Sequence, residues 1–289
     1  MSWLRRDRVA LFYEEAGVGE PPMLLVHGLA CDHTHLTPQL EHFSDDHRVV
    51  AVDLRGHGQS DAPQQEYTIE GFANDLAWVC ARLGLENPVV VGHSLGGEIC
   101  LALAASYPDL PVAVVAMDST LVPPRERLEM MRPFIESLRT PAYPEELRRF
   151  FSGFFLPTDD PERKARILAQ APSTPQHVVA SEWENCYFAY DDAAAAAACR
   201  VPVLYIDAGT PNTDLSRFGE LCPRLVTGRT VGSGHFVQLE VPEQVNAMIE
   251  RFLAVALRDR NFGLVGEPGS LGPGPFRSQG LQAQLWHDI

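Results

Sequence analysis

The stretch Pro88-Val89-Val90-Val91-Gly92-His93-Ser94-Leu95-Gly96-Gly97 decides the fold. Its first half is a continuous apolar run, which is typical of a strand buried on both faces of a parallel sheet. A helical pattern follows over residues 95–107. Ser94 therefore lies on a sharp strand-to-helix turn with the pattern G-x-S-x-G, where small flanking residues avoid collision with the sheet and the helix. The plainer alternative is an ordinary glycine-rich turn.

Similar strand and helix patterns lie on both sides of this stretch. We predict strands at residues 8–15, 23–26, 48–53, 88–92, 112–117, 201–206 and 225–231, and helices at 67–83, 95–107, 215–221 and 242–257. Such alternation predicts an α/β fold with a mostly parallel central sheet flanked by helices. Between the strands at 112–117 and 201–206 the pattern is helical and interrupted by prolines, which indicates a helical cap over the strand ends.

These patterns divide the chain into three parts. We expect a core from residues 1–118 and 200–258, with the cap at 119–199. The segment 259–289 is rich in Gly and Pro, and we expect it to be poorly ordered and unrelated to chemistry.

Composition narrows the possible partners. The chain has 23 Lys and Arg against 38 Asp and Glu, a net charge of −15, so nucleic acids and anionic membranes are not expected as partners. Its six cysteines form no CxxC pair, which argues against a zinc site and a disulfide framework. Without a signal-like apolar core or a stretch long enough to span a membrane, the sequence predicts a cytoplasmic protein with no membrane insertion. The oligomeric state stays open.

A serine hydroxyl needs a neighbouring base before it becomes a good nucleophile. The stretch Gly232-Ser233-Gly234-His235-Phe236 follows a predicted strand and precedes the last helix, so His235 is the candidate base. Nine other histidines lack this combination of late position and small neighbours. The alternative is a solvated loop histidine.

Four blocks together resemble the α/β-hydrolase superfamily over about residues 8–257. They are His27-Gly28, Asp53-Leu54-Arg55-Gly56-His57-Gly58-Gln59-Ser60, Gly92-His93-Ser94-Leu95-Gly96-Gly97 and Gly234-His235-Phe236. The resemblance implies a nucleophile at Ser94, a general base at His235, and an oxyanion hole made by the backbone N–H groups of Leu29 and Leu95. It implies structural or pocket-lining roles for His27 and His93, and structural roles for Arg55 and His57.

The third member of the expected triad departs from the family pattern. The family usually places an acid shortly after the strand at 201–206, where this chain has Pro211. Asp214 comes slightly late and opens a helical pattern, so it is also a candidate helix N-cap. Some family members take the acid from the end of the preceding strand, where Asp118 stands. We prefer Asp118 and keep Asp214 as the alternative acid.

The resemblance implies a serine esterase or lactonase that acts on a small-molecule ester or lactone without a metal or an organic cofactor. A serine nucleophile argues against epoxide hydrolase and haloalkane dehalogenase chemistry, which needs a carboxylate. The alternatives are a carbon–carbon bond hydrolase, a cofactor-free dioxygenase or a perhydrolase on the same triad, and a catalytically weak receptor or binding protein. Cap aromatics are candidates for lining the pocket, namely Phe134, Phe150, Phe151, Phe154, Phe155, Trp183, Tyr187, Phe188 and Tyr190.

Overall fold

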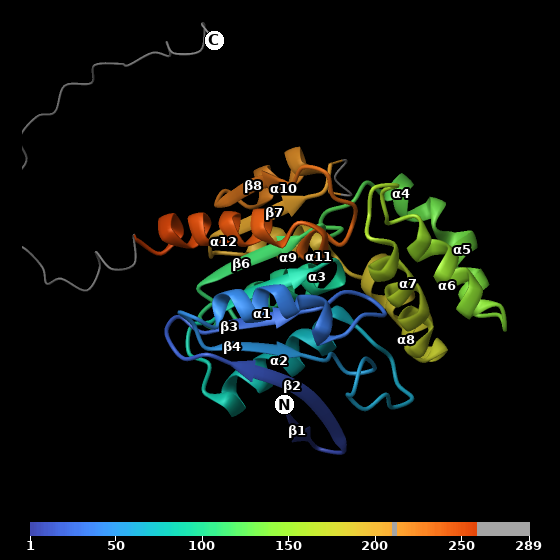
Figure 1. The fold of residues 1–289 in the computed structure, drawn as a ribbon, viewed down its shortest axis with the longest axis horizontal. Coiled ribbons are helices and arrows are strands. Elements are labelled where there is room, and N and C mark those ends of the chain that lie inside the picture. The colour runs from blue at the N-terminus through green and yellow to red at the C-terminus, as the bar shows by residue number, and fades with distance from the viewer. Residues whose placement is uncertain (210–212, 259–289) are drawn as a thin grey trace, which may run out of the picture.

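An eight-stranded sheet runs through the molecule (Figure 1). The computed structural model describes residues 1–209 and 213–258. The strands are β1 (Ser2–Arg6), β2 (Val9–Ala16), β3 (Met23–Val26), β4 (Val49–Val52), β5 (Val89–His93), β6 (Ala113–Met117), β7 (Val203–Asp207) and β8 (Leu225–Arg229). Their order is β1-β2-β4-β3-β5-β6-β7-β8. β2 pairs antiparallel with β1 and with β4, and the other neighbours are parallel, which confirms the predicted fold class.

Helices cover both faces of the sheet because alternate strand residues point to opposite sides. On β3, Leu24 and Val26 belong to the core that packs under α2 (Ile69–Leu83) and α3 (Leu95–Ser106). Their neighbours Met23 and Leu25 belong to a second core that packs under α1 (Thr37–Phe43) and α12 (Pro242–Ala256). The central strands are therefore apolar throughout.

A helical insert separates β6 from β7, as predicted. Its helices are α4 (Arg125–Met130), α5 (Arg132–Leu138), α6 (Tyr143–Ser152), α7 (Pro161–Gln170), α8 (Gln176–Glu182) and α9 (Asp192–Ala198), with a π-helix, η3, at Trp183–Phe188. In Figure 1, α4 to α8 form a layer at one end of the sheet. We call the segment from α4 to η3 the cap. His57 Nε2 in the core lies 3.4 Å from Glu182 Oε1 in α8, so a buried ion pair joins the core to the cap.

Several short elements are absent from the sequence prediction. β1 has the sequence Ser-Trp-Leu-Arg-Arg, in which the two apolar residues are adjacent, so it shows no apolar alternation, and it pairs with β2 through a turn at Asp7. α11 (Val237–Glu240) is a single turn, too short to show a period. α10 (Leu215–Leu221) matches its prediction. The tail expected at 259–289 lies outside the described residues. Among the described residues, no helix combines the length and apolarity needed to cross a membrane.

Candidate active site

Ser94 occupies the bend between β5 and α3. Its backbone has φ 53° and ψ −124°, a conformation that costs free energy for a residue with a side chain and often marks functional sites. The bend is held because the Ser94 amide donates to the Met117 carbonyl over 2.9 Å. A Cβ on Gly92 would lie 2.2 Å from the Gly96 backbone, and a Cβ on Gly96 would lie 2.2 Å from the Val26 oxygen. Glycine is therefore required at both flanks.

The structure brings His235 to Asp118. Their Nδ1 and Oδ2 atoms are 2.6 Å apart, so Nδ1–H donates to the carboxylate and Nε2 is left for other partners. The other oxygen of Asp118 accepts from the Ala208 amide over 3.1 Å. Asp118 also has a positive φ of 45°, a second strained residue beside the bend at Ser94. Two contacts therefore fix the carboxylate that orients the imidazole.

Asp214, the alternative acid, makes its hydrogen bond at the start of α10 and does not contact His235. Its carboxylate accepts from the Arg217 amide over 3.0 Å and caps α10. Asp207 lies at the end of β7, where it accepts from the Gly209 amide and from Arg229. Pro211, which stands where the family usually has its acid, lies outside the described residues. Of the carboxylates weighed from the sequence, Asp118 is the one that contacts His235.

The two expected oxyanion donors flank Ser94. Leu95 is the first residue of α3, so its amide is among the N–H groups that have no acceptor within the helix. Leu29 lines the same cavity as Ser94. A Cβ on Gly28, just before it, would lie 3.0 Å from the Ser94 Cβ, so the loop after β3 approaches the serine closely.

The remaining motif histidines and Arg55 hold loops in place. Burial lowers the pKa of His27 to about 3, and its Nε2 accepts from the Leu54 amide over 3.0 Å. Burial, with His235 nearby, places the pKa of His93 well below its usual value, and its Nε2 donates to the His235 carbonyl. Arg55 binds Asp75 through two hydrogen bonds. These contacts agree with the structural roles expected for them.

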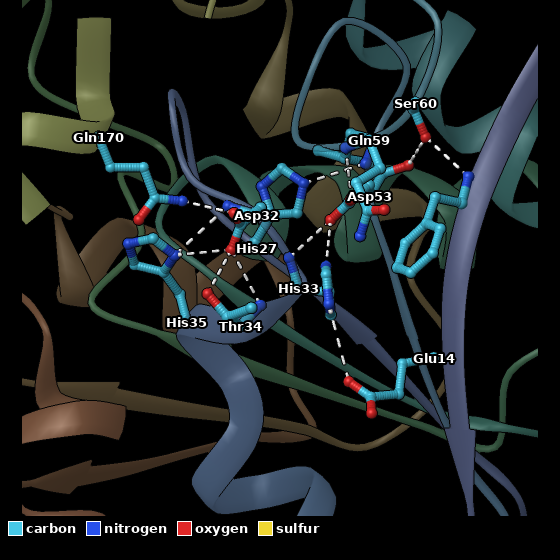
Figure 2. Close-up of polar contacts among 12 residues, drawn as sticks. Glu14, His27, Asp32, His33, Thr34, His35, Asp53, Gln59, Ser60 and Gln170 are labelled. Atoms are coloured by element: carbon cyan, nitrogen blue, oxygen red, sulfur yellow. Dashed lines mark hydrogen bonds and ion pairs between the residues drawn. The ribbon is translucent and has the colours of Figure 1, made fainter. Parts of the chain in front are cut away.

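A polar network beneath the loop after β3 escaped the sequence analysis. Figure 2 shows Asp53 between His33, Gln59 and the loop around Ser60. One carboxylate oxygen of Asp53 is 2.7 Å from both the His33 amide nitrogen and its ring Nδ1, and the other accepts from the Gln59 amide. The network ties the turn after β4 to the loop that carries Leu29. The sequence analysis identified Asp53 as part of a motif, but it did not identify His33 as the partner of Asp53.

The cap contacts the candidate catalytic residues directly. The His235 amide donates to the Phe154 carbonyl over 3.0 Å, and the rings of these two residues lie 4.3 Å apart. Tyr187, on η3, lines the same cavity as Ser94. The contacts of Phe154 with His235 were not predicted, because they join residues that are distant in the sequence.

A cavity of about 560 Å³ opens over these groups. It is lined by Ser94, Asp118 and His235 from the core and by apolar side chains of the cap. Six of the nine candidate aromatics contribute, namely Phe150, Phe151, Phe154, Phe155, Trp183 and Tyr187. Phe134 instead stacks on Phe150, with ring centroids 4.5 Å apart. No Lys or Arg occurs among the described residues that line the cavity.

A pair of buried acids lies where α3 packs against α9. Glu98 of α3 is 1% exposed, and burial together with the charge of Asp192 raises its pKa well above its usual value. Burial, with a contribution from Asp191, raises the pKa of Asp192 to about 8. Both groups are therefore largely protonated in the folded protein at neutral pH.

The raised pKa of Asp192 predicts a loss of stability at alkaline pH. A carboxyl whose folded pKa lies above its unfolded value stabilises fully below the unfolded pKa, and that stabilisation disappears as the pH rises through the folded value. Between pH 5 and pH 9, the unfolding free energy of the wild type should fall by on the order of 3 kcal/mol more than that of the Asp192→Asn variant. Urea unfolding at several pH values measures this difference. Asp160→Asn is the control, because Asp160 is exposed, is not among the groups that raise the pKa of Asp192, and caps α7, where Asn serves as well as Asp. Parallel pH profiles for the wild type and Asp192→Asn would contradict the assignment.

Comparison with known proteins places this chain in a family. The family model described as alpha/beta hydrolase fold matches residues 21–242. The chain therefore belongs to the alpha/beta hydrolase fold family.

Similar proteins include hydrolases of different substrates. A 2-(acetamidomethylene)succinate hydrolase of Mesorhizobium japonicum is 40% identical over 113 residues, which cover 39% of this chain and 40% of that protein. The match thus spans less than half of this relative's length. A thermophilic esterase from Thermogutta terrifontis is similar in structure, with a TM-score of 0.75, 26% identity, and coverage of 85% of this chain and 93% of its own. The enol-lactonase from Burkholderia xenovorans LB400 has a TM-score of 0.78 at 23% identity, with coverage of 88% and 100%, which supports the fold alone.

Proposed function

We propose that this protein is a serine hydrolase that cleaves a neutral carboxylic ester or lactone. The observation that carries the proposal is the 2.6 Å contact between His235 and Asp118 at the wall of a cavity that Ser94 also lines. A carboxylate on Nδ1 leaves Nε2 of the imidazole as a base, and the strained bend holds the serine hydroxyl clear of the backbone. The similar esterase from Thermogutta terrifontis supports the same chemistry.

The proposed reaction has two steps. Ser94 Oγ attacks the substrate carbonyl carbon while His235 Nε2 takes the hydroxyl proton. The backbone N–H groups of Leu29 and Leu95 donate to the oxygen that becomes negative. His235 then gives its proton to the leaving alkoxide, and an acyl ester remains on Ser94. In the second step His235 takes a proton from water, which attacks the acyl group and releases the acid. Asp118 stays ionised and stabilises the imidazolium.

The cavity wall argues for an uncharged substrate. A carboxylate that leaves water must meet a cation or several donors, because burial of an unpaired charge is costly. The described wall is mostly aromatic and aliphatic, with the hydroxyl groups of Thr120 and Ser233, and it contains no Lys or Arg. It also carries the carboxylate of Asp118, which repels a second anion. A dicarboxylate such as the succinate in the name of the Mesorhizobium relative fits this wall poorly.

The proposal is tested by turnover and by trapping. The full-length protein is incubated with p-nitrophenyl acetate and butyrate, and with γ- and δ-lactones in a pH-stat. A fluorophosphonate is added separately, and the labelled peptide is identified by mass. We expect turnover of at least one ester or lactone and one phosphonate per chain on the Ser94 peptide. Absence of both turnover and label would refute the proposal, and label without turnover would favour a binding protein or another reaction on the same triad.

Two substrates of equal length test the preference for a neutral acyl group. We expect kcat/KM for p-nitrophenyl hemisuccinate to be lower than for p-nitrophenyl butyrate by about 100-fold, which corresponds to about 2.7 kcal/mol of uncompensated charge burial. Met131→Arg, which adds a cation to the wall, should reduce the difference in kcat/KM between the two substrates, while Met131→Leu should leave this difference unchanged. Equal rates for the two substrates in the wild type would show that the wall does not select against charge.

A further inference from the structure

The loop that carries His235 has no secondary structure of its own to hold it. Residues 231–236 form neither helix nor strand, so their backbone N–H and C=O groups need partners from elsewhere. The His235 amide donates to the Phe154 carbonyl over 3.0 Å, and the His235 carbonyl accepts from His93 Nε2 over 2.9 Å. The backbone of His235 is therefore held by the cap on one side and by the bend at Ser94 on the other.

One carboxylate holds the two residues that flank His235. Glu240 Oε2 accepts from the Gly234 amide over 2.6 Å, and Glu240 Oε1 accepts from the Phe236 amide over 3.2 Å. An ionised carboxylate can accept at both oxygens, and hydrogen bonds to a charged acceptor are stronger than those between neutral groups. Glu240 therefore fixes both ends of the tripeptide whose middle residue is the proposed base.

The residues at the two ends of this tripeptide allow a close approach. A Cβ on Gly234 would lie 2.2 Å from the Phe154 carbonyl oxygen and 3.2 Å from Glu240 Oε1. Glycine thus lets the cap and the carboxylate reach the backbone together. At the other end, Phe236 is fully buried and stacks on Phe155, with ring centroids 5.4 Å apart. The tripeptide is therefore closely packed as well as hydrogen-bonded.

The turn that carries Glu240 is itself anchored to the cap. Glu240 ends α11, a single turn. Arg163, on α7 of the cap, donates to the Leu239 carbonyl over 2.8 Å and pairs with Asp159, whose side chain is 1% exposed. Burial raises the pKa of Glu240, with a contribution from Asp159, while the two clamped amides and Arg163 lower it. The bonds that hold the loop thus favour the ionised form of Glu240 that accepts both of them.

We propose that Glu240 is a positioning residue, whose carboxylate keeps the imidazole of His235 aligned between the proposed nucleophile and Asp118 by holding both flanking amides. This inference rests on the proposed function. Glu240 is not among the described residues that line the cavity, so it acts through the backbone of the loop. Release of either amide frees one end of the tripeptide, and a catalytic group misplaced by about 1 Å can cost about 100-fold in rate.

The Glu240→Gln variant tests the need for two accepting oxygens. Gln has the same shape, but its amide offers one accepting oxygen, and its NH2 group meets an N–H donor that it cannot bind. We expect kcat for p-nitrophenyl butyrate to fall about 10- to 100-fold, with KM within about twofold of the wild type because the cavity wall is intact. Glu243→Gln, which changes an exposed carboxylate in the first turn of α12, is the matched control and should keep full activity.

The Glu240→Ala variant separates positioning from a merely structural role. Truncation leaves space for a small carboxylate at a position that is partly exposed to solvent. We expect kcat to fall at least as far as in Glu240→Gln, and added acetate to restore it about tenfold. Acetamide, which has nearly the same shape but one accepting oxygen, should restore none of it. Thermal midpoints with and without acetate show whether the rate merely follows folding.

A spectroscopic readout does not depend on ester hydrolysis. The proton that His235 Nδ1 donates to Asp118 should give a resonance far downfield in the proton NMR spectrum of the full-length protein, assigned by its absence in His235→Gln. We expect this resonance to be sharp in the wild type and in Glu243→Gln. In Glu240→Gln it should broaden into the baseline, because a loop that opens more often exposes the proton to exchange with water.

Three results would overturn the proposal. One is a downfield resonance that is as sharp in Glu240→Gln as in the wild type, or that is absent from the wild type itself. Another is a kcat for Glu240→Gln within about twofold of that of an active wild type. The third is a rate of Glu240→Ala that acetate restores no better than acetamide does. A wild type that hydrolyses no ester, combined with the expected broadening, would refute the proposed function while it sustains the positioning of His235 by Glu240.

Discussion

The Ser94→Ala variant is expected to hydrolyse p-nitrophenyl butyrate about 10⁴- to 10⁶-fold more slowly than the wild type in kcat, because the acyl-enzyme has no oxygen on which to form. Backbone donors at Leu29 and Leu95 remain, so residual turnover above that of water is expected. KM should change little, because the apolar cavity wall is intact. Initial rates with a stopped-flow or plate assay measure this loss.

The fold of the variant should be unaffected. Alanine keeps the Cβ of Ser94, and the backbone bond from residue 94 to the Met117 carbonyl does not involve the side chain. Circular dichroism and the thermal midpoint should match those of the wild type. Ser152→Ala, which removes an exposed hydroxyl bonded to the Arg149 carbonyl, is the matched control and should keep full activity. A Ser94→Ala rate within tenfold of the wild type would mean that hydrolysis, if present, uses another nucleophile.

Much of the core was predictable because its signals are local. A central strand buried on both faces must be apolar throughout, so β3, β5 and β6 appear in the sequence as short runs of Val, Leu and Ala. The bend at Ser94 was predictable for a similar reason. Backbone lies within 2.2 Å of any Cβ placed at Gly92 or Gly96, so the glycines that flank the serine record the geometry of the turn.

The partner of His235 was harder to predict because the signal is not local. Asp118 and Asp214 each follow a strand pattern, and each stands before the histidine in chain order. What distinguishes them is where β6 and α10 lie around His235, which depends on strand order. The sequence pattern did indicate the N-cap role of Asp214, through the helix that begins at Leu215, and the structure confirms that role.

Contacts between the cap and the core were the least predictable part of the site. Phe154 packs on His235, and Tyr187 lines the same cavity as Ser94, although the residues of these pairs lie 81 and 93 positions apart in the sequence. The cap sequence is rich in aromatics that serve both packing and cavity lining, so composition alone cannot separate Phe134, which packs, from Phe154, which lines the cavity. Only the path of the chain between α6 and η3 separates these roles.

The Asp118→Asn variant is expected to lower kcat about 10³- to 10⁴-fold, the second-largest effect of the predicted changes. An amide at this position can donate to Nδ1 of His235, which would leave the proton on Nε2 and remove the base from Ser94. It would also fail to stabilise the imidazolium. Because the concentration of hydroxide, which can act as the base in place of His235, grows with pH, the residual rate should rise with pH instead of reaching a plateau.

Asp214→Asn is the matched control, since both variants replace one carboxylate by an isosteric amide. Asn caps a helix as well as Asp does, so the bond from the Arg217 amide and the stability of α10 should persist. Activity should stay within twofold of the wild type. The opposite pattern, a large loss in Asp214→Asn and a small one in Asp118→Asn, would require His235 to turn away from its 2.6 Å contact with Asp118 during catalysis. The pair of variants therefore tests whether the geometry seen between these two side chains is the geometry that the reaction uses.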